Sequence, residues 1–121
     1  MSSPLIIDIK FVNDHSTILD FVDKVNSLLK NGYTLNGPTK SVGTRLSQML
    51  VKYNIQPSSE YTIVSYTVIG ATKTINLEKA LMDTINNGWV FYGDHEYSQN
   101  TSDSTIYTWQ ALVKYKKPLV K

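Results

Sequence analysis

The sequence contains no cysteine, which excludes disulfide bonds, thiolate nucleophiles and zinc sites with cysteine ligands together. It also lacks any apolar run of about 18 residues, the length that a membrane-spanning helix requires. The amino-terminal stretch MSSPLIIDIK has no basic region, and Asp8 interrupts its apolar residues, so it does not have the pattern of a secretory signal peptide. We therefore expect a cytoplasmic protein with no membrane partner.

Arginine is also scarce. Arg45 is the single arginine, and the net charge is only +2. Proteins that follow nucleic-acid phosphates usually carry denser basic patches and favour arginine for its two-pronged hydrogen bonding. The basic tail KYKKPLVK is typical of solvated lysines near a chain end. A nucleic-acid partner is therefore not expected.

Motifs that carry out catalysis are absent. There is no glycine-rich phosphate loop, HExxH or GxSxG sequence, and there are only two histidines. Asp-His-Ser at 14–16 are neighbours in the chain and cannot form a proton relay, whereas they suit the start of a helix. Asp-His-Glu at 94–96 can bring at most Asp94 and Glu96 to one face of a strand, so a polar hairpin is favoured over a metal site. We predict a non-enzymatic protein with no catalytic residue, no metal site and no cofactor.

What the sequence does contain is a repeat. Asn31-Gly32-Tyr33 recurs as Asn87-Gly88-Trp89, and Gly37 recurs as Gly93, in each case 56 residues later. QMLVKY at 48–53 then matches QALVKY at 110–115, which lies 62 residues later. The extra six residues fall in the polar segment SQNTSDST, which is typical of a lengthened hairpin loop.

Each copy has the periodicity of strand, helix, strand, strand. Apolar residues alternate with polar ones around Ile9 and again around Tyr66, which predicts strands. An apolar stripe of helical spacing follows each strand, and the first helix should begin near Ser16 or Thr17 and the second around 74–76. Gly32 and Gly88 should end the helices, and Gly37 and Gly93 should each mark a bend or a bulge in the next strand.

Two such units predict one α+β domain over residues 1–121, with one repeat at 4–56, the other at 60–117 and QPSSE between them. We expect an antiparallel sheet of about six strands, or a pair of sheets, with both helices on one face. The copies are expected to pack about a pseudo-twofold axis, as two chains do in an isologous dimer.

The last strand of each copy has one side of mixed character. Gln48, Leu50 and Lys52 share that side in the first copy, and the same pattern recurs at 110–114. This mixture suits a partner surface, and it equally suits the moderately amphipathic outer side of a sheet. Nearby aromatic and cationic residues could bind an anionic, ring-bearing ligand such as a nucleotide, although each taken singly is more often explained by packing. The predicted ligand-binding residues are Arg45, Gln48, Lys52, Tyr92, Tyr107, Trp109, Gln110 and Lys114.

The helix followed by NGW at 87–89, by Gly93 and by QALVK at 110–114 resembles the domain of unknown function 1737 family, whose pattern is GWxxxGG followed by QalvK. The first copy departs from this pattern, with Tyr33 in place of Trp and Met49 in place of Ala. The likeness covers about positions 16–53 and 74–116. It implies tandem βαββ units from bacteria or their phages, without an assigned activity and without catalytic residues.

Two functional hypotheses follow. The first is an oligomeric phage-type sponge that sequesters a nucleotide immune signal, of the cyclic oligonucleotide or cyclic ADP-ribose type, and so counters host antiviral defence. It predicts a homo-oligomer in the cytoplasm of a bacterium or a phage-infected host, with a pocket at a chain interface lined by Arg45 and aromatic residues. The second is a protein–protein interaction module with no small-molecule ligand, and it predicts an open face without such a pocket.

Overall fold

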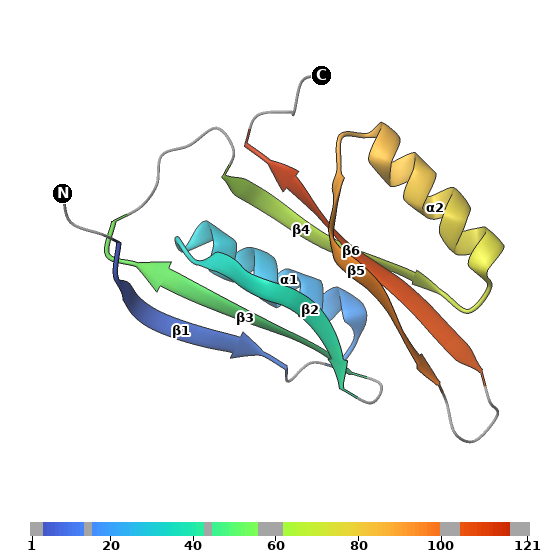
Figure 1. Cartoon of the computed structure of the whole chain (residues 1–121), viewed down its shortest axis with the longest axis horizontal. Coiled ribbons are helices and arrows are strands. Elements are labelled where there is room, and N and C mark those ends of the chain that lie inside the picture. The colour runs from blue at the N-terminus through green and yellow to red at the C-terminus, as the bar shows by residue number, and fades with distance from the viewer. Residues whose placement is uncertain (1–3, 14–15, 43–44, 56–61, 100–104, 117–121) are drawn as a thin grey trace.

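The computed structural model describes residues 4–13, 16–42, 45–55, 62–99 and 105–116 (Figure 1). The first half contains β1 (Ile6–Val12), α1 (Ile18–Lys30), β2 (Thr34–Val42) and β3 (Arg45–Tyr53). The second half contains β4 (Ile63–Ala71), α2 (Thr74–Asn86), β5 (Val90–Gln99) and β6 (Ile106–Tyr115). The α+β class and the strand, helix, strand, strand order of each half are confirmed. The QPSSE segment and residues 100–104 of the polar insert lie outside the described residues.

The strands form two separate sheets. The order is β1-β3-β2 in the first sheet and β4-β6-β5 in the second, and all pairings are antiparallel. The expectation of one sheet of about six strands is therefore wrong, and the alternative of a pair of sheets describes the molecule. A continuous sheet is prevented because α1, rather than a strand of the first half, packs against β4. Strands β2 and β5 also lie side by side, without forming a ladder.

The two sheets share their irregularities. Each has one register shift near the start of its first strand and one in the middle of its second strand. Gly37 and Gly93 lie in the second pair of shifts with φ of 79° and 71°, the left-handed region that favours glycine. The predicted bulges are thus confirmed at both glycines. The shifts fall at Ile6/Asp8 and Asn36/Lys40 in the first half, and at Ile63/Ser65 and Tyr92/Glu96 in the second.

The helices begin and end near the predicted residues. The side chain of Thr17 accepts a hydrogen bond from the amide of Asp20 at 3.0 Å, which caps α1. No side chain caps α2, which follows Lys73. Both helices end at the Asn-Gly pair, and the amide of Tyr33 donates back to the carbonyl of Leu28 at 3.0 Å.

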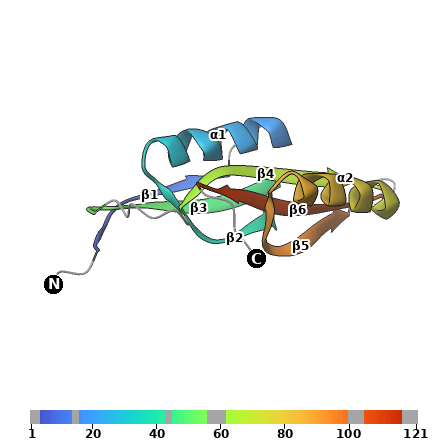
Figure 2. The same ribbon diagram turned by 90° about the horizontal axis from the view of Figure 1, so that it is seen from above.

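The main core lies between α1 and both sheets. Figure 2 shows α1 standing over the sheets on one side of the molecule. Phe21, Val22 and Val25 of α1 are buried among residues from each half. The other buried members of this core are Val12, Leu46, Leu50, Tyr66, Val68, Trp109, Ala111 and Val113.

The two halves are not related as a twofold pair. A twofold axis would make their contacts reciprocal, so that α2 would pack on β1 as α1 packs on β4. Instead β1 and α2 lie at opposite ends of the molecule in both views (Figures 1 and 2). The expected pseudo-twofold packing is therefore wrong, because α1 packs across both sheets whereas α2 packs on its own sheet.

Candidate interaction surface

Two of the predicted ligand-binding residues are buried amides. Gln48 is 1% exposed and Gln110 is 7% exposed. The Gln48 amide nitrogen donates to the carbonyl of Gly37 at 3.0 Å, and that of Gln110 donates to the carbonyl of Gly93 at 3.0 Å. Each glutamine thus ties the central strand of its sheet to the bulge of the neighbouring strand.

The two predicted lysines occupy matching positions as well. The ammonium of Lys52 lies 5.4 Å from the ring centroid of Tyr33, and that of Lys114 lies 5.7 Å from the ring centroid of Trp89. These distances are within the range of a cation–π contact. The aromatic residue that follows each Asn-Gly pair is therefore covered by a lysine of the last strand in its own half.

The remaining predicted residues lie in different places. Trp109 is buried in the core, and Arg45 is exposed at the start of β3. The hydroxyl of Tyr92 donates to the carbonyl of Gly37 at 2.5 Å and so joins β5 to β2. Tyr107 packs so closely over Gly70 that a Cβ there would lie 2.3 Å from its hydroxyl. Burial raises the pKa of both tyrosines.

The eight residues do not converge on one site. Leu50 and Leu112, which lie between the predicted glutamines and lysines, are completely buried. The hypothesis that this side is an exposed partner surface is therefore wrong, because the side carrying Gln48 and Leu50 faces α1 and its matching side faces α2. A role for the eight residues in ligand binding stays a prediction.

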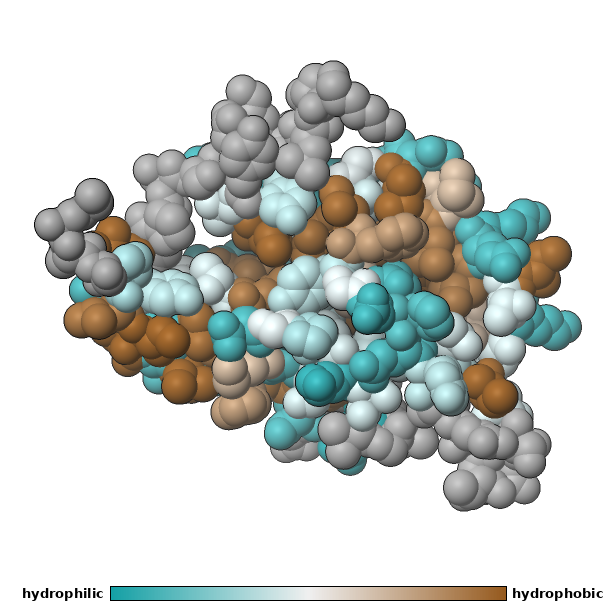
Figure 3. Space-filling model, in the orientation of Figure 1, coloured by the Kyte–Doolittle hydropathy of each residue, from teal (hydrophilic) through white to brown (hydrophobic). Residues whose placement is uncertain are grey.

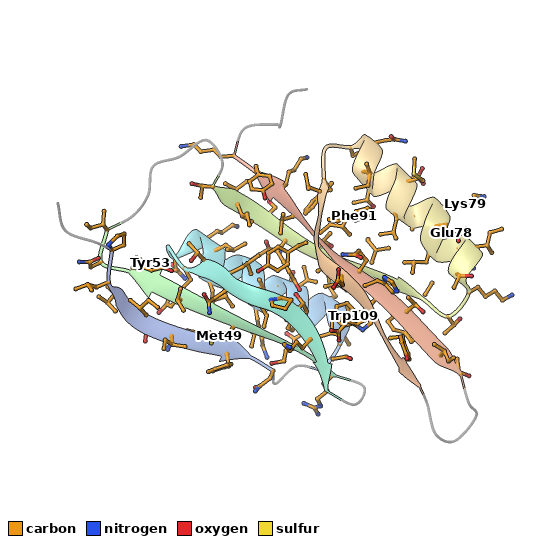
Figure 4. All side chains as sticks on the ribbon, in the orientation of Figure 1. Met49, Tyr53, Glu78, Lys79, Phe91 and Trp109 are labelled. Atoms are coloured by element: carbon orange, nitrogen blue, oxygen red, sulfur yellow. The ribbon has the colours of Figure 1, made fainter. Side chains whose placement is uncertain are left out.

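The opposite side of the first sheet is open along β1, although Val51 of β3 is buried there. Side chains of directly paired residues point to the same face of a sheet, and Ile6, Ile9 and Phe11 pair with Tyr53, Val51 and Met49. We call the surface made by Ile6, Ile9, Phe11, Met49 and Tyr53 the outer face. Figure 3 shows hydrophobic residues gathered over β1, and Figure 4 labels Met49 and Tyr53 on the neighbouring β3.

The matching face of the second sheet is covered. Ile9 pairs with Val51 and Tyr66 pairs with Val113, so Ile9 and Tyr66 occupy matching positions. By the same register, Phe11 matches Val68. The exposed fractions are 51% for Ile9 against 1% for Tyr66, and 62% for Phe11 against 8% for Val68. The open face is thus the feature by which the first sheet differs most from the second.

Two depressions border β1. One, of about 300 Å³, is lined by Phe11 and Met49 of the outer face together with residues around the Gly37 bulge. The other, of about 390 Å³, lies between β1 and α1, where Lys10 and Lys24 supply positive charge. None of the eight predicted ligand-binding residues lines either depression.

A buried polar network connects the halves. The Thr39 hydroxyl lies 2.6 Å from the Gln48 amide oxygen and 2.5 Å from the Tyr66 hydroxyl. Burial raises the pKa of Tyr66, so its hydroxyl stays protonated and available for this network. The Glu96 carboxylate accepts hydrogen bonds from the amide and hydroxyl of Ser41 at 2.9 and 3.1 Å. No spacing in the sequence predicts the contacts of Thr39 with Tyr66 and of Ser41 with Glu96, since their partners lie in different halves.

Within the described part of the chain, no group of three or more His, Asp or Glu side chains is placed to hold a metal ion. The two described helices are both too short to cross a bilayer.

The chain was compared with known proteins at three levels. No family model, no curated protein and no solved structure matches it. The resemblance to the domain of unknown function 1737 family therefore stays a prediction, and the surface itself is the basis for inferring a function.

Proposed function

We propose that the chain is a non-enzymatic protein-interaction module and that its outer face binds a protein partner. The observation that carries this proposal is the exposure of Ile6, Ile9 and Phe11 on a face whose counterpart in the second half is buried. Burying one such side chain completely contributes about 1.5–3 kcal/mol. Five partly exposed members can therefore contribute several kcal/mol to a complex.

The position of β1 supports the same conclusion. Strand β1 is at the edge of its sheet, as β4 is in the other sheet. The amide of Asn26 in α1 donates to the carbonyl of Tyr66 at 2.8 Å, and its oxygen accepts from the Tyr66 backbone N–H at 2.9 Å, which covers the edge of β4. Edge strands that are exposed and apolar promote association unless something covers them. A partner would cover the exposed edge and face of β1, as α1 covers those of β4.

A photo-crosslinking experiment tests this proposal. Benzoylphenylalanine introduced at Phe11 should form a crosslinked adduct with a protein of defined mass when the protein is irradiated in expressing cells. The same residue at Leu19, an exposed apolar position on α1, is the matched control and should give no adduct of that mass. Equal crosslinking at both positions, or none at Phe11, would overturn the proposal.

We also infer that the halves are tandem copies of one βαββ unit. Their common strand order and their four matching register shifts support this inference, because bulges are specific features of a strand pairing and rarely recur at the same positions by chance.

The second candidate function is the nucleotide sponge. The depression of about 390 Å³ between β1 and α1 favours it, since Lys10, Lys24 and Phe11 there combine positive charge with an aromatic ring. The ammonium of Lys24 also lies 3.3 Å from the Asp20 carboxylate, so an anionic ligand would have to compete with this ion pair. The outer face is therefore the better supported site.

Isothermal titration with cyclic di- and trinucleotides and with cyclic ADP-ribose isomers tests the sponge. Binding that is abolished by Lys10→Ala with Lys24→Ala and is unchanged by Lys79→Ala on α2 would support it. The absence of heat for every nucleotide would exclude this group of ligands.

A further inference from the structure

We propose that α2 of one copy of the chain packs on the outer face of the next, head to tail, and repeats between chains the contact that α1 makes with the second sheet. This inference rests on the proposed function, because it names the partner of the same face.

The contact inside the chain provides the template. Helix α1 packs with one side on the first sheet and with the other against β4. The ring of Phe21 meets the ring of Tyr66 edge to face at 6.1 Å, and Asn26 makes its two hydrogen bonds to the Tyr66 backbone. Helix α1 thus packs against the face of the first sheet that carries Leu50 and against the face of the second sheet that carries Tyr66 and Val113.

The first sheet presents the surface that this template requires. Ile9 and Phe11 occupy the positions of Tyr66 and Val68, as the strand register shows. They are apolar and exposed, and the depression of about 300 Å³ beside Phe11 and Met49 offers space for an inserted side chain. A helix seated there would cover both β1 and the exposed part of β3.

The second half presents the matching helix with one side uncovered. Helix α2 buries Leu77, whereas Met82 is exposed, and the exposed Glu78 occupies the position of the buried Val22. Met82 precedes its Asn-Gly pair by the same number of residues as Asn26 does, so it stands where α1 contacts Tyr66. Phe91 pairs with Leu112 as Leu35 pairs with Leu50, yet Phe91 is exposed and Leu35 is packed against the core.

Phe91 lies on the strand that follows α2. Figure 3 shows a second hydrophobic region between β5 and α2, and Figure 4 places Phe91 there. The chain therefore has one half of a core at each end: a sheet face without a helix at β1, and a helix with a free side at α2. Two copies placed head to tail would complete one such core.

This contact joins two different surfaces, so it is heterologous. Heterologous contacts produce closed rings when the rotation between copies closes, and open chains when it does not. The contact between copies should be weaker than its internal template. The side chain of Met82 has no hydrogen-bonding group for the backbone of β1. The side-chain amide of Asn26, in contrast, bonds both the N–H and the C=O of Tyr66. We therefore expect assembly that depends on protein concentration.

Two charge substitutions at exposed positions test the proposal. Phe11→Glu places a carboxylate on the outer face, and Met82→Glu places one on α2. Both should dissociate the assembly that the unaltered chain shows by native mass spectrometry and sedimentation velocity. Leu19→Glu, on the exposed side of α1, is the matched control and should leave the assembly intact. Circular dichroism should show that all three variants are folded, because each replaced side chain is more than half exposed.

Mixing the two dissociated variants is the decisive step. The Phe11→Glu chain retains its α2 surface and the Met82→Glu chain retains its outer face, so together they should form a 1:1 dimer that grows no further. Pairing between two outer faces predicts a different result, in which Met82→Glu assembles normally with itself and the mixture gives no mixed dimer of the two variants. That result would overturn the head-to-tail contact, and so would an unaltered chain that is monomeric at all concentrations tested.

The failure of this inference is distinguishable from the failure of the proposed function. A monomeric chain that still crosslinks through position 11 to a different protein retains an interaction face and loses the second copy as its partner. A chain that neither crosslinks through position 11 nor assembles loses both.

Discussion

Strands β1 and β4 begin their halves with the same alternation of apolar and polar residues, yet their environments are opposite. Tyr66 and Val68 of β4 are buried under α1, whereas Ile9 and Phe11 of β1 are more than half exposed. The alternation tells which face of a strand is apolar. What covers that face depends on where the next helix lies, and here the helix that covers β4 belongs to the other half. The difference therefore arises from the arrangement of the halves and not from the strands themselves.

The helices show the same difference from the other side. Helix α1 packs across both sheets and buries three residues, whereas α2 packs on its own sheet and buries one. The four predictions below test this comparison at matched positions. The unfolding free energies should be measured at protein concentrations at which the chain is monomeric.

Tyr66→Ala and Ile9→Ala should differ most. Replacing a large buried aromatic residue by alanine costs about 3–5 kcal/mol of unfolding free energy, because it leaves a cavity in the core. Tyr66 also loses its contacts with Phe21 and Thr39. Ile9→Ala should cost less than about 1 kcal/mol, since an exposed side chain has little burial to lose. Urea unfolding measures both, and equal losses would contradict the difference in environment.

Asn26→Ala and Met82→Ala compare the two helices. Asn26→Ala leaves the Tyr66 backbone N–H and C=O without partners, so the unfolding free energy should fall by about 2–3 kcal/mol. Met82→Ala removes an exposed side chain and should change it by less than about 0.5 kcal/mol. Hydrogen exchange gives a second measurement, because the Tyr66 amide should lose protection in Asn26→Ala. Unchanged protection would show that the amide of Asn26 does not hold this edge.

Gly37→Ala and Gly93→Ala test a feature that the halves share. Both glycines have left-handed φ angles, so each substitution should cost about 1–2 kcal/mol in unfolding free energy. A Cβ at Gly93 would lie 3.4 Å from the Cβ of Pro38, whereas at Gly37 nothing lies within 4 Å. The two losses should therefore be similar, with that of Gly93→Ala slightly larger. A clear loss at only one glycine would contradict the equivalence of the bulges.

The smallest effect concerns a contact that is present in the first half. The hydroxyl of Tyr33 donates to the Asp8 carboxylate, and this hydrogen bond lowers the pKa of Asp8 below its usual 3.8. A lowered folded-state pKa stabilises the protein above the unfolded pKa, and the contribution is lost as pH falls through the folded value. Tyr33→Phe should raise the Asp8 pKa towards 3.8 and reduce the stability lost on acidification. Carbon NMR titration of the Asp8 carboxyl tests this, and an unchanged pKa would contradict it.

The same hydrogen bond affects the alkaline side. The hydrogen bond to Asp8 raises the pKa of Tyr33 above 10.0. The contribution of this hydrogen bond to stability is therefore complete below pH 10.0 and is lost as pH rises through the pKa of Tyr33 in the folded protein. Tyr33→Phe should remove this alkaline loss as well, which provides an internal control for the acid titration.

The repeat made much of the fold predictable. The spacing of Asn31-Gly32 and Asn87-Gly88 located the helix ends, and Gly37 and Gly93 located the bulges, because positive φ angles depend on the local residue. The sequence left one sheet and a pair of sheets as alternatives and could not decide between them. The separation into two sheets depends on α1 packing against β4, a contact between segments about forty residues apart that neither segment encodes alone.

The burial of the candidate site residues could not be predicted from their residue types. Gln48 and Gln110 have the composition of surface residues, and polar side chains that alternate with leucine usually face water. Both are buried because the bulge at each glycine leaves a carbonyl that needs a donor, and the glutamine amide supplies it. The exposed face was missed because Ile9 and Phe11 have the composition of a core.

The burial of Trp109 allows its fluorescence to report on the state of the core. Trp109 lies in the core beneath α1 and is almost completely buried, whereas the other tryptophan, Trp89, is half-buried beside a lysine. In a Trp89→Phe variant the emission of Trp109 alone would shift to longer wavelength once water reaches the core beneath α1. Fluorescence would then follow the separation of the halves in real time, without any attached dye.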